Sequence, residues 1–433
     1  MDDILKTRGS QTLFLSYRYL LLFEANAEWK KDLALGMVKL VTVLTNQLSN
    51  LTTSDISMYT GLSGIGLFFY RLCNVDRQFI DDSVKSDAVS QSQKITRRCL
   101  RHVDYDRLYK NVSVFTSFIG ALCLGALVGN PEHGDVRMTM DKCFEQIISA
   151  SKFAVKTDSA MPDEALYGRT GYLCALLALS NARRDVPVDV VSSVVNAIVQ
   201  SGKVTAKRYQ SEGAYRSLML HSRRSDLPMP PLMFEWHEKA YLGGAHGFAG
   251  ILLTLIKVSQ VFQEAVSAKV MDDLVMPTVH WMGELQMDSG NWPSSLGSSL
   301  DRDVLVHWCH GATGVVPLML AAYQLTSDKR YLERAIRGGE AIWARGLLHK
   351  GCGLCHGSAG SGYALLDLYR TTNDEKYLYR AVKFAEWCTN CFENRTRIAD
   401  RPYSLFEGLA GTLYFLADIL DPKQARYPLL SGV

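Results

Sequence analysis

Long apolar runs are missing from this chain of 433 residues. Its longest runs, such as Ile119 to Val128, fall short of the roughly 20 residues that a membrane-spanning helix needs. The N-terminus, Met1-Asp2-Asp3, lacks the basic and apolar regions of a signal peptide, and it lacks the glycine at position 2 that N-myristoylation requires. We therefore expect a cytoplasmic protein that associates with membranes at most peripherally.

An excess of charge of one sign is missing as well. The 47 Lys and Arg residues nearly balance the 44 Asp and Glu residues, and the net charge is +3. Because the basic residues are scattered, we expect no nucleic-acid partner. Hydrophobic residues make up 47% of the chain, enough for the core of an ordinary globular protein. In a cytoplasmic chain the ten cysteines should be mostly reduced and buried, and any exceptions are candidate ligands or nucleophiles.

Strand patterns are sparse, and a helical repeat takes their place. No long alternation of β-branched and polar residues flanked by turns is present. Instead, a glycine pair followed by about three apolar helical turns recurs along the chain, which indicates a repeat architecture. The pairs are Gly61/Gly64, Gly168/Gly171, Gly244/Gly247, Gly311/Gly314, Gly357/Gly360 and Gly408/Gly411, and a degenerate copy from Thr116 to Gly120 makes the seventh unit.

Each unit predicts one buried helix and one half-exposed helix. Residues after a glycine pair are apolar on most sides of a helix, whereas intervening stretches such as Tyr377 to Cys388 have one apolar face. The last unit, Leu409 to Leu420, is as apolar as the middle ones, although an open solenoid needs a polar cap there. We therefore predict an all-α fold: an α/α toroid of seven inner and seven outer helices, forming a single domain over residues 1–433.

One segment, from Gly202 to Lys239, interrupts the repeat. Basic residues such as Lys203 and Lys207 are followed by prolines from Pro228 onward. We predict that this segment is a solvated loop over one end of the ring, where loops often cover sites.

Two Cys-His motifs carry the strongest chemical signal. Cys309-His310-Gly311-Ala312 is nearly repeated at Cys355-His356-Gly357-Ser358, an offset of 46 residues (355 − 309) that also superposes Tyr323 on Tyr369 and Arg334 on Arg380. If consecutive units lie side by side, Cys309 and Cys355 approach each other. Thiolates with an imidazole suit zinc, and a catalytic zinc would use three of the four donors and leave one position for substrate. The spacing does not choose between the two histidines.

A competing metal site would use thiolates alone. Cys352-x-x-Cys355 and Cys388-x-x-Cys391 could form a four-thiolate structural zinc site, but the gap between the pairs is wider than usual and Cys309 would have no role. Redox use of Cys352-x-x-Cys355 is weaker still, because no βαβ pattern surrounds it.

The combined motifs resemble the LanC-like proteins, eukaryotic relatives of the lanthipeptide cyclases, over nearly the whole chain. The resemblance rests on the glycine units and on Trp308-Cys309-His310-Gly311, Gly353-Leu354-Cys355-His356-Gly357, Ala245-His246-Gly247 and Phe406-Glu407-Gly408-Leu409-Ala410-Gly411. It implies an α/α toroid with one zinc ion held by Cys309, Cys355 and His356. It also implies that glutathione binds as co-substrate and is added to dehydroalanine or dehydrobutyrine residues of protein or peptide partners.

The resemblance further assigns the glutathione-binding positions to Lys350 and to Arg397, Ile398, Ala399 and Asp400. The family often has a proline where this chain has Ala399. Without it the local turn, and hence the direction of the Arg397 side chain, is less defined. Lys350 and Arg397 supply cations for the two carboxylates of glutathione, and Asp400 could bind its ammonium group. The thiol of glutathione would lose its proton on zinc and become the nucleophile.

Two further residues are candidates for catalysis. His246 is the expected general acid that protonates the enolate left by conjugate addition. Glu164 matches an acidic position of the cyclases and could orient a catalytic group or relay a proton. A structural role explains this residue equally well, because a carboxylate is favoured near a helix N-terminus. His310 is either a second acid or a packed histidine.

Two other classes of function remain open. In the first, the protein is a non-catalytic glutathione- and zinc-binding scaffold or signalling adaptor. The second is a zinc-dependent prenyl transferase, which rests only on the shared use of helical toroids.

Overall fold

The computed structural model describes residues 28–430 apart from 105–109, 129–138, 157–160, 221–223, 298–302 and 395. Within these ranges the chain is helical, and β-structure is limited to two isolated bridges, Trp236 with Lys239 and Tyr241 with Ser295. None of the described helices is long and apolar enough to cross a membrane. The N-terminal residues used in the signal-peptide argument lie outside the described ranges.

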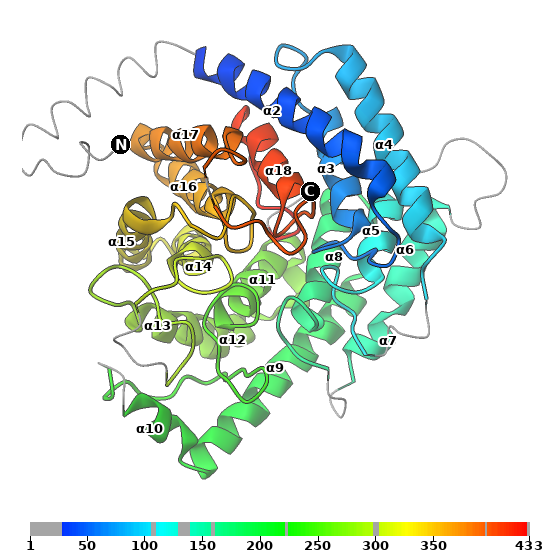
Figure 1. Ribbon diagram of the computed structural model, residues 1–433. Helices are drawn as coiled ribbons and strands as arrows, with labels where there is room; N and C mark the ends of the chain where they lie inside the picture. Colours follow the sequence, from blue (N-terminus) through cyan, green and yellow to red (C-terminus); the bar gives the residue numbers. More distant parts are fainter. Residues whose placement is uncertain are drawn as a thin grey trace, which may run out of the picture.

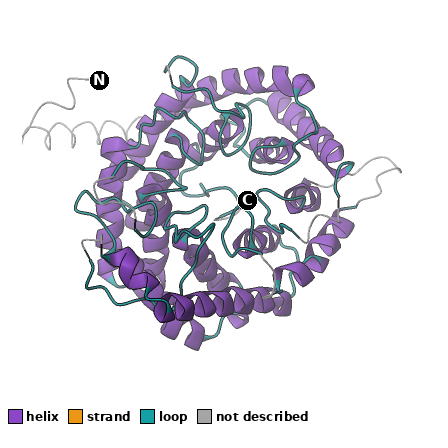
Figure 2. Cartoon of the chain, turned by 60° about the horizontal axis from the view of Figure 1, so that its bottom comes forward, coloured by secondary structure: helices purple, strands orange, loops and turns teal. Residues whose placement is uncertain are grey.

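The described helices form two concentric rings (Figures 1 and 2). The inner ring consists of α3 (Leu62–Cys73), α5 (Ile119–Val128), α8 (Arg169–Asn181), α11 (Phe248–Val261), α14 (Ala312–Thr326), α16 (Ser358–Thr372) and α18 (Leu409–Ile419). The outer ring consists of α2 (Glu28–Gln47), α4 (Asp82–Leu100), α6 (Met140–Ser149) with α7 (Ser151–Ala154), α9 (Val188–Ser211), α12 (Ala268–Val270) with η4 (Met271–Val275) and α13 (Met276–Glu284), α15 (Lys329–Arg345) and α17 (Glu375–Thr389). The predicted seven-plus-seven toroid is confirmed for the described residues.

The ring closes between the two ends of the chain. Each inner helix contacts the next, and α18 packs against both α2 and α3, while α17 packs against α2. Because the last unit is covered by the first, its apolar surface needs no polar cap.

The glycine pairs lie at the N-terminal turns of the inner helices and permit very close backbone contacts. A Cβ atom at Gly360 would lie 2.0 Å from the carbonyl oxygen of Leu354. Gly311, which precedes α14, has a φ of +105°, a conformation that side-chain-bearing residues rarely adopt. These turns therefore require glycine.

A belt of backbone hydrogen bonds joins the glycine turns of neighbouring units at one end of the ring. The donor and acceptor residues are Tyr59 and Phe115, Val114 and Gly171, Ala165 and Ala245, Gly244 and Trp308, Cys309 and Cys355, Cys355 and Phe406, and Phe406 and Tyr59. Every unit is thus tied to the next, and the last is tied to the first. The belt places the turns of sequentially distant motifs side by side.

The prediction of a solvated loop over residues 202–239 is wrong for its first half. Residues 202–211 complete α9, and α10 (Ala214–Met219) follows. Gly202, Ala206 and Tyr209 are buried at helical spacing, while Lys207 is exposed. The basic residues are therefore the solvated face of an amphipathic helix.

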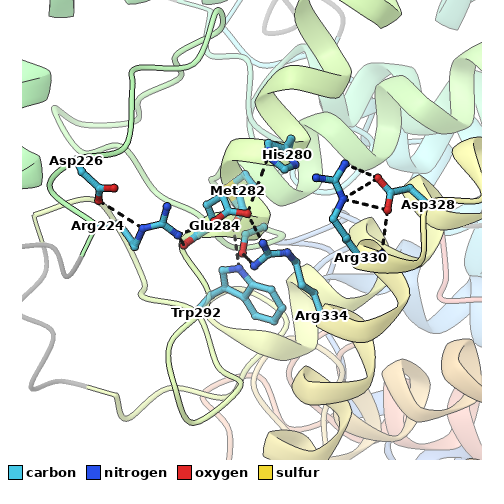
Figure 3. Close-up of polar contacts among 10 residues, drawn as sticks. Arg224, Asp226, His280, Met282, Glu284, Trp292, Asp328, Arg330 and Arg334 are labelled. Carbon is cyan, nitrogen blue, oxygen red and sulfur yellow. Dashed lines mark hydrogen bonds and ion pairs between the residues drawn. The ribbon is translucent and has the colours of Figure 1, made fainter.

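Repeated ion pairs join successive outer helices. Arg334 of α15 pairs with Glu284 of α13, and its repeat equivalent Arg380 of α17 pairs with Glu340 of α15. Figure 3 shows that Arg224, from the segment after α10, reaches the same Glu284 carboxylate, with an N···O distance of 2.5 Å. The arginines that match at the 46-residue offset (380 − 334) thus have equivalent structural roles.

Glu284→Gln should lower the free energy of unfolding at pH 7 by about 1–2 kcal/mol, the lower part of the range for charged hydrogen bonds because solvent partly screens this cluster. Burial alone would raise the pKa of Glu284, but the hydrogen bond from Arg224 and the charges of Arg334 and Arg224 outweigh it and lower the pKa. Because the folded-state pKa is depressed, the stabilisation is present above the unfolded value of about 4.3 and is lost as pH falls through the folded value.

Urea unfolding at pH 7 and at pH 3.5 measures this difference between the Gln variant and the wild type. Asp226→Asn is the matched control, because Asp226 is 77% exposed and pairs with the same Arg224 at 3.5 Å. A Gln variant as stable as the wild type at pH 7 would contradict the assigned role of Glu284.

Candidate metal and thiol-binding site

Three potential metal ligands meet where the turns before α14 and α16 touch. The ligand atoms of Cys309, Cys355 and His356 all lie within 4.8 Å of one another, and no other group of three or more His, Cys, Asp or Glu residues among the described ranges is as close. The amide of Cys309 donates to the carbonyl of Cys355 over 3.3 Å. Two thiols and one imidazole form a donor set that fits zinc and leaves one tetrahedral position free.

The two thiols differ in acidity. Hydrogen bonding with Cys355 lowers the pKa of Cys309 well below its usual value, against the effect of burial, and His307 and His356 lower it further. Burial raises the pKa of Cys355. Cys309 is therefore the sulfur that ionises first, and a cation would be needed to hold both as thiolates.

The structure separates the two histidines of the repeated motif. His356 lies with the cysteines, whereas His310 is not part of the group. The Nδ1 atom of His310 is buried and has no hydrogen-bond partner among the described residues, and burial lowers the pKa of this imidazole. The duplicated motif is thus asymmetric in three dimensions.

His307 is a neighbour of the group that the sequence argument missed. Its side chain is buried, and its Nδ1 lies 3.9 Å from the sulfur of Cys309. The repeat could not reveal it, because the position 46 residues later is Gly353. The one sequence feature that could have pointed to His307 is its position two residues before Cys309.

The four cysteines of the competing site do not come together. Cys355 belongs to the group with Cys309, and no four-thiolate group forms among the described residues. Burial raises the pKa of Cys388, and hydrogen bonding with Cys352 and the nearby Cys391 raise it further. These thiols have the properties of packed core cysteines.

A cavity of about 140 Å³ opens beside His356. Its other lining residues are Lys350, Arg397, Ala399, Asp400 and Glu407. Four of the five predicted glutathione positions therefore lie around one space that reaches His356, one of the three potential metal ligands. The fifth, Ile398, is 80% exposed and does not line it. Glu407, which belongs to the motif from Phe406 to Gly411, is an additional lining residue that the sequence did not predict.

Arg397 and Asp400 are paired with each other. The guanidinium of Arg397 donates to Oδ1 of Asp400 over 2.9 Å, and both side chains are well exposed. The backbone amide of Arg397 donates to the carbonyl of His349, which fixes this segment against the turn that carries Lys350. One edge of the guanidinium is occupied, and its remaining donors are available to a ligand.

His246 and Glu164 form a hydrogen-bonded pair. Nδ1 of His246 lies 2.8 Å from Oε2 of Glu164, whose side chain is only 1% exposed. The same carboxylate accepts hydrogen bonds from the amides of Leu166 and Tyr167. These amides precede α8, so Glu164 holds a turn and the imidazole together. Because a carboxylate only accepts, Nδ1 carries the hydrogen and Nε2 is left for other partners.

A row of rings connects His246 with the metal-ligand turn. Tyr241 lies between His246 and His310, with centroid distances of 5.9 and 5.6 Å. On the other side, Tyr167 and Trp236 are stacked with His246 at interplanar angles of 4° and 14°. The imidazole is therefore held by rings as well as by Glu164.

The local backbone of Trp236 depends on an unusual turn. Trp236 and Lys239 exchange two backbone hydrogen bonds around His237 and Glu238, which both have positive φ angles of 47° and 60°. Such a turn in non-glycine residues is costly and often marks a functional region. It places the Trp236 ring against His246.

Comparisons with known proteins bear on the family and the fold of this chain. The sequence matches the family model for lanthionine synthetase C-like proteins over residues 52–431. Glutathione S-transferase LANCL1 of Danio rerio is 36% identical over 398 residues, which cover 90% of this chain and 88% of the relative. Among solved structures, nisin cyclase aligns with a TM-score of 0.59 and 14% identity over 88% of this chain and 93% of its own, a likeness that concerns the fold alone.

Proposed function

Because the chain belongs to the lanthionine synthetase C-like family, we propose that it is a zinc-dependent transferase that adds the thiol of glutathione to dehydroalanine or dehydrobutyrine residues of proteins or peptides. The main support for the proposal is that His356 belongs both to the group with Cys309 and Cys355 and to the lining of the cavity that Lys350 and Arg397 share. The relative named as a glutathione S-transferase supports this choice of thiol. A single toroidal domain in the cytoplasm completes the proposal.

The cavity offers groups that suit the charges of glutathione. Lys350 and the free donors of Arg397 would bind its carboxylates, and Asp400 or Glu407 its ammonium group. This arrangement brings the glutathione sulfur toward His356. When bound by Cys309, Cys355 and His356, zinc would keep that sulfur in its nucleophilic thiolate form.

His246 supplies the proton that the reaction needs. The sulfur forms a bond to the β-carbon of the alkene, and the α-carbon then takes up a proton, so the product is a thioether. Nε2 of His246 is free to deliver this proton while Glu164 holds Nδ1 and stabilises the cationic ring.

Incubation of the zinc-loaded protein with glutathione and a dehydroalanine peptide tests the proposal. The expected product is a thioether adduct whose mass equals that of the peptide plus intact glutathione. A folded, zinc-loaded protein that binds glutathione and gives no adduct would instead support the scaffold or adaptor alternative. A prenyl transferase has no specific observation in its favour.

Arg397→Gln should raise the KM for glutathione about three- to tenfold with little change in kcat. The factor is modest because Arg397 is 63% exposed and screened. Steady-state kinetics with varied glutathione measures it. Arg401→Gln is the matched control, an exposed arginine four residues later that does not line the cavity. An equal effect of both variants would point to general electrostatic attraction instead of a contact.

A further inference from the structure

A second cavity lies at the opposite end of the inner ring. It has a volume of about 130 Å³, many times the roughly 15 Å³ that one water requires. Its lining comes from the middle and C-terminal turns of α11, α14 and α16 and from Arg426, which follows α18. The inner helices all begin at the belt of glycine turns, whereas Lys257, Gln324 and Thr371 lie in or next to their last turns, so this cavity and the metal-ligand turns share no lining residue.

Positive charge dominates the second cavity. Lys257, Arg370 and Arg426 line it together with one carboxylate, that of Asp367, and the other polar lining residues, Gln324 and Thr371, are neutral. The formal charge of the lining is thus +2 (three cations and one anion). The hydrocarbon part consists of Leu253, Pro317, Leu320 and Ala321.

The simplest alternative is that these cations only neutralise helix C-termini. It fits Arg370, which lies in the last turn of α16, and both arginines also have hydrogen-bond partners. Arg370 donates to the carbonyl of Ala425 and to Asp367, and Arg426 donates to the carbonyls of Lys423 and Ala425. These bonds hold the segment after α18 on the inner ring.

Lys257 is different. It lies four residues before the end of α11, and its ammonium group makes no hydrogen bond or ion pair with any residue that the structure describes. Burial lowers its pKa, and the charges of Arg370 and Arg426 lower it further, against the opposite effect of Asp367. Lys257 is half-buried, and an ammonium group that is partly removed from water beside two guanidinium groups is stabilised when an anion joins it.

We propose that this cavity is a binding site for a phosphate-type oxyanion, either the free ion or the phosphate group of a monoester. Lys257 would contact the anion directly, and the unused N–H groups of Arg370 and Arg426 would complete its coordination. The anion would link α11, α16 and the segment after α18. The site is independent of zinc and of the thiol chemistry at the other end.

Isothermal titration calorimetry of the full-length, zinc-loaded protein in a chloride buffer tests the site, with inorganic phosphate and phenyl phosphate as probes. Tighter binding of one probe identifies the free ion or the monoester as the natural class. Lys257→Met should weaken binding at least about tenfold, as expected for loss of a charged hydrogen bond. Asp367→Asn should tighten it, because the repelling carboxylate disappears while an acceptor for Arg370 remains.

Two controls keep the interpretation specific. Lys350→Met removes a cation from the other cavity and should leave phosphate binding unchanged, and Lys257→Met should still form the glutathione adduct. In phosphate-free buffer Lys257→Met should have a higher Tm than the wild type, which also shows that it folds. The site would be refuted if neither probe binds, if Lys257→Met binds as tightly as the wild type, or if binding is lost in Lys350→Met.

Discussion

Cys309→Ala should abolish stoichiometric zinc binding and adduct formation, whereas Cys352→Ala should leave both intact. Removing Cys309 leaves only Cys355 and His356 of the three grouped donors. The affinity should fall by more than the roughly 10- to 100-fold that loss of an outer-shell partner costs, because a direct ligand is removed. Zinc content by mass spectrometry and affinity by chelator competition measure the change.

Cys352 is a stringent control for this experiment. It is buried in the same turn, three residues before Cys355, and lies beside Cys388 instead of the grouped donors. Both variants remove one sulfur, so a general effect of thiol loss would appear in both. If Cys352→Ala lost the metal and Cys309→Ala kept it, the four-thiolate site would be correct and the open coordination site wrong.

His307 provides an internal test of the ligand set. Its Nδ1 is 3.9 Å from the sulfur of Cys309, which places it beside the grouped donors. His307→Ala should therefore weaken zinc within the outer-shell range of roughly 10- to 100-fold, less than Cys309→Ala does. Loss equal to that of Cys309→Ala would make His307 a ligand.

His246→Asn should lower kcat for adduct formation about 10²- to 10⁴-fold, the usual contribution of a positioned acid or base. Zinc content and the KM for glutathione should stay near wild-type values, because His246 belongs neither to the grouped donors nor to the lining of the glutathione cavity. His237→Asn is the matched control, an exposed histidine next to Trp236. A normal kcat in His246→Asn would remove this residue from the mechanism.

Glu164→Gln separates orientation from proton transfer. The glutamine keeps a carbonyl acceptor for Nδ1 of His246 but loses the negative charge that stabilises the protonated ring. We expect a kcat between those of the wild type and His246→Asn, again with zinc retained. If Glu164 only holds the turn through Leu166 and Tyr167, thermal stability should fall while kcat per folded molecule stays constant.

Much of the fold was predictable because a local sequence pattern that repeats along the chain specifies each helix pair. Glycine pairs before apolar runs marked the starts of the inner helices, and the apolar last unit indicated closure. The prediction failed where it relied on local charge. Lys203 and Lys207 were assigned to a loop, although the buried Gly202 and Ala206 place them on a helix. Burial at helical spacing outweighs a local excess of charge.

The sequence by itself determined that two Cys-His turns belong to adjacent units, since the 46-residue offset repeats both the motif and its supporting helices. The tertiary structure decided which donors meet: His356 joins the cysteines, and His310 faces Tyr241. It also brought Glu164 to His246 from 82 residues away and set Lys257 beside Arg370 and Arg426. A repeat specifies equivalent backbone positions, but the contacts of each side chain depend on its neighbours around the ring, and these differ from unit to unit.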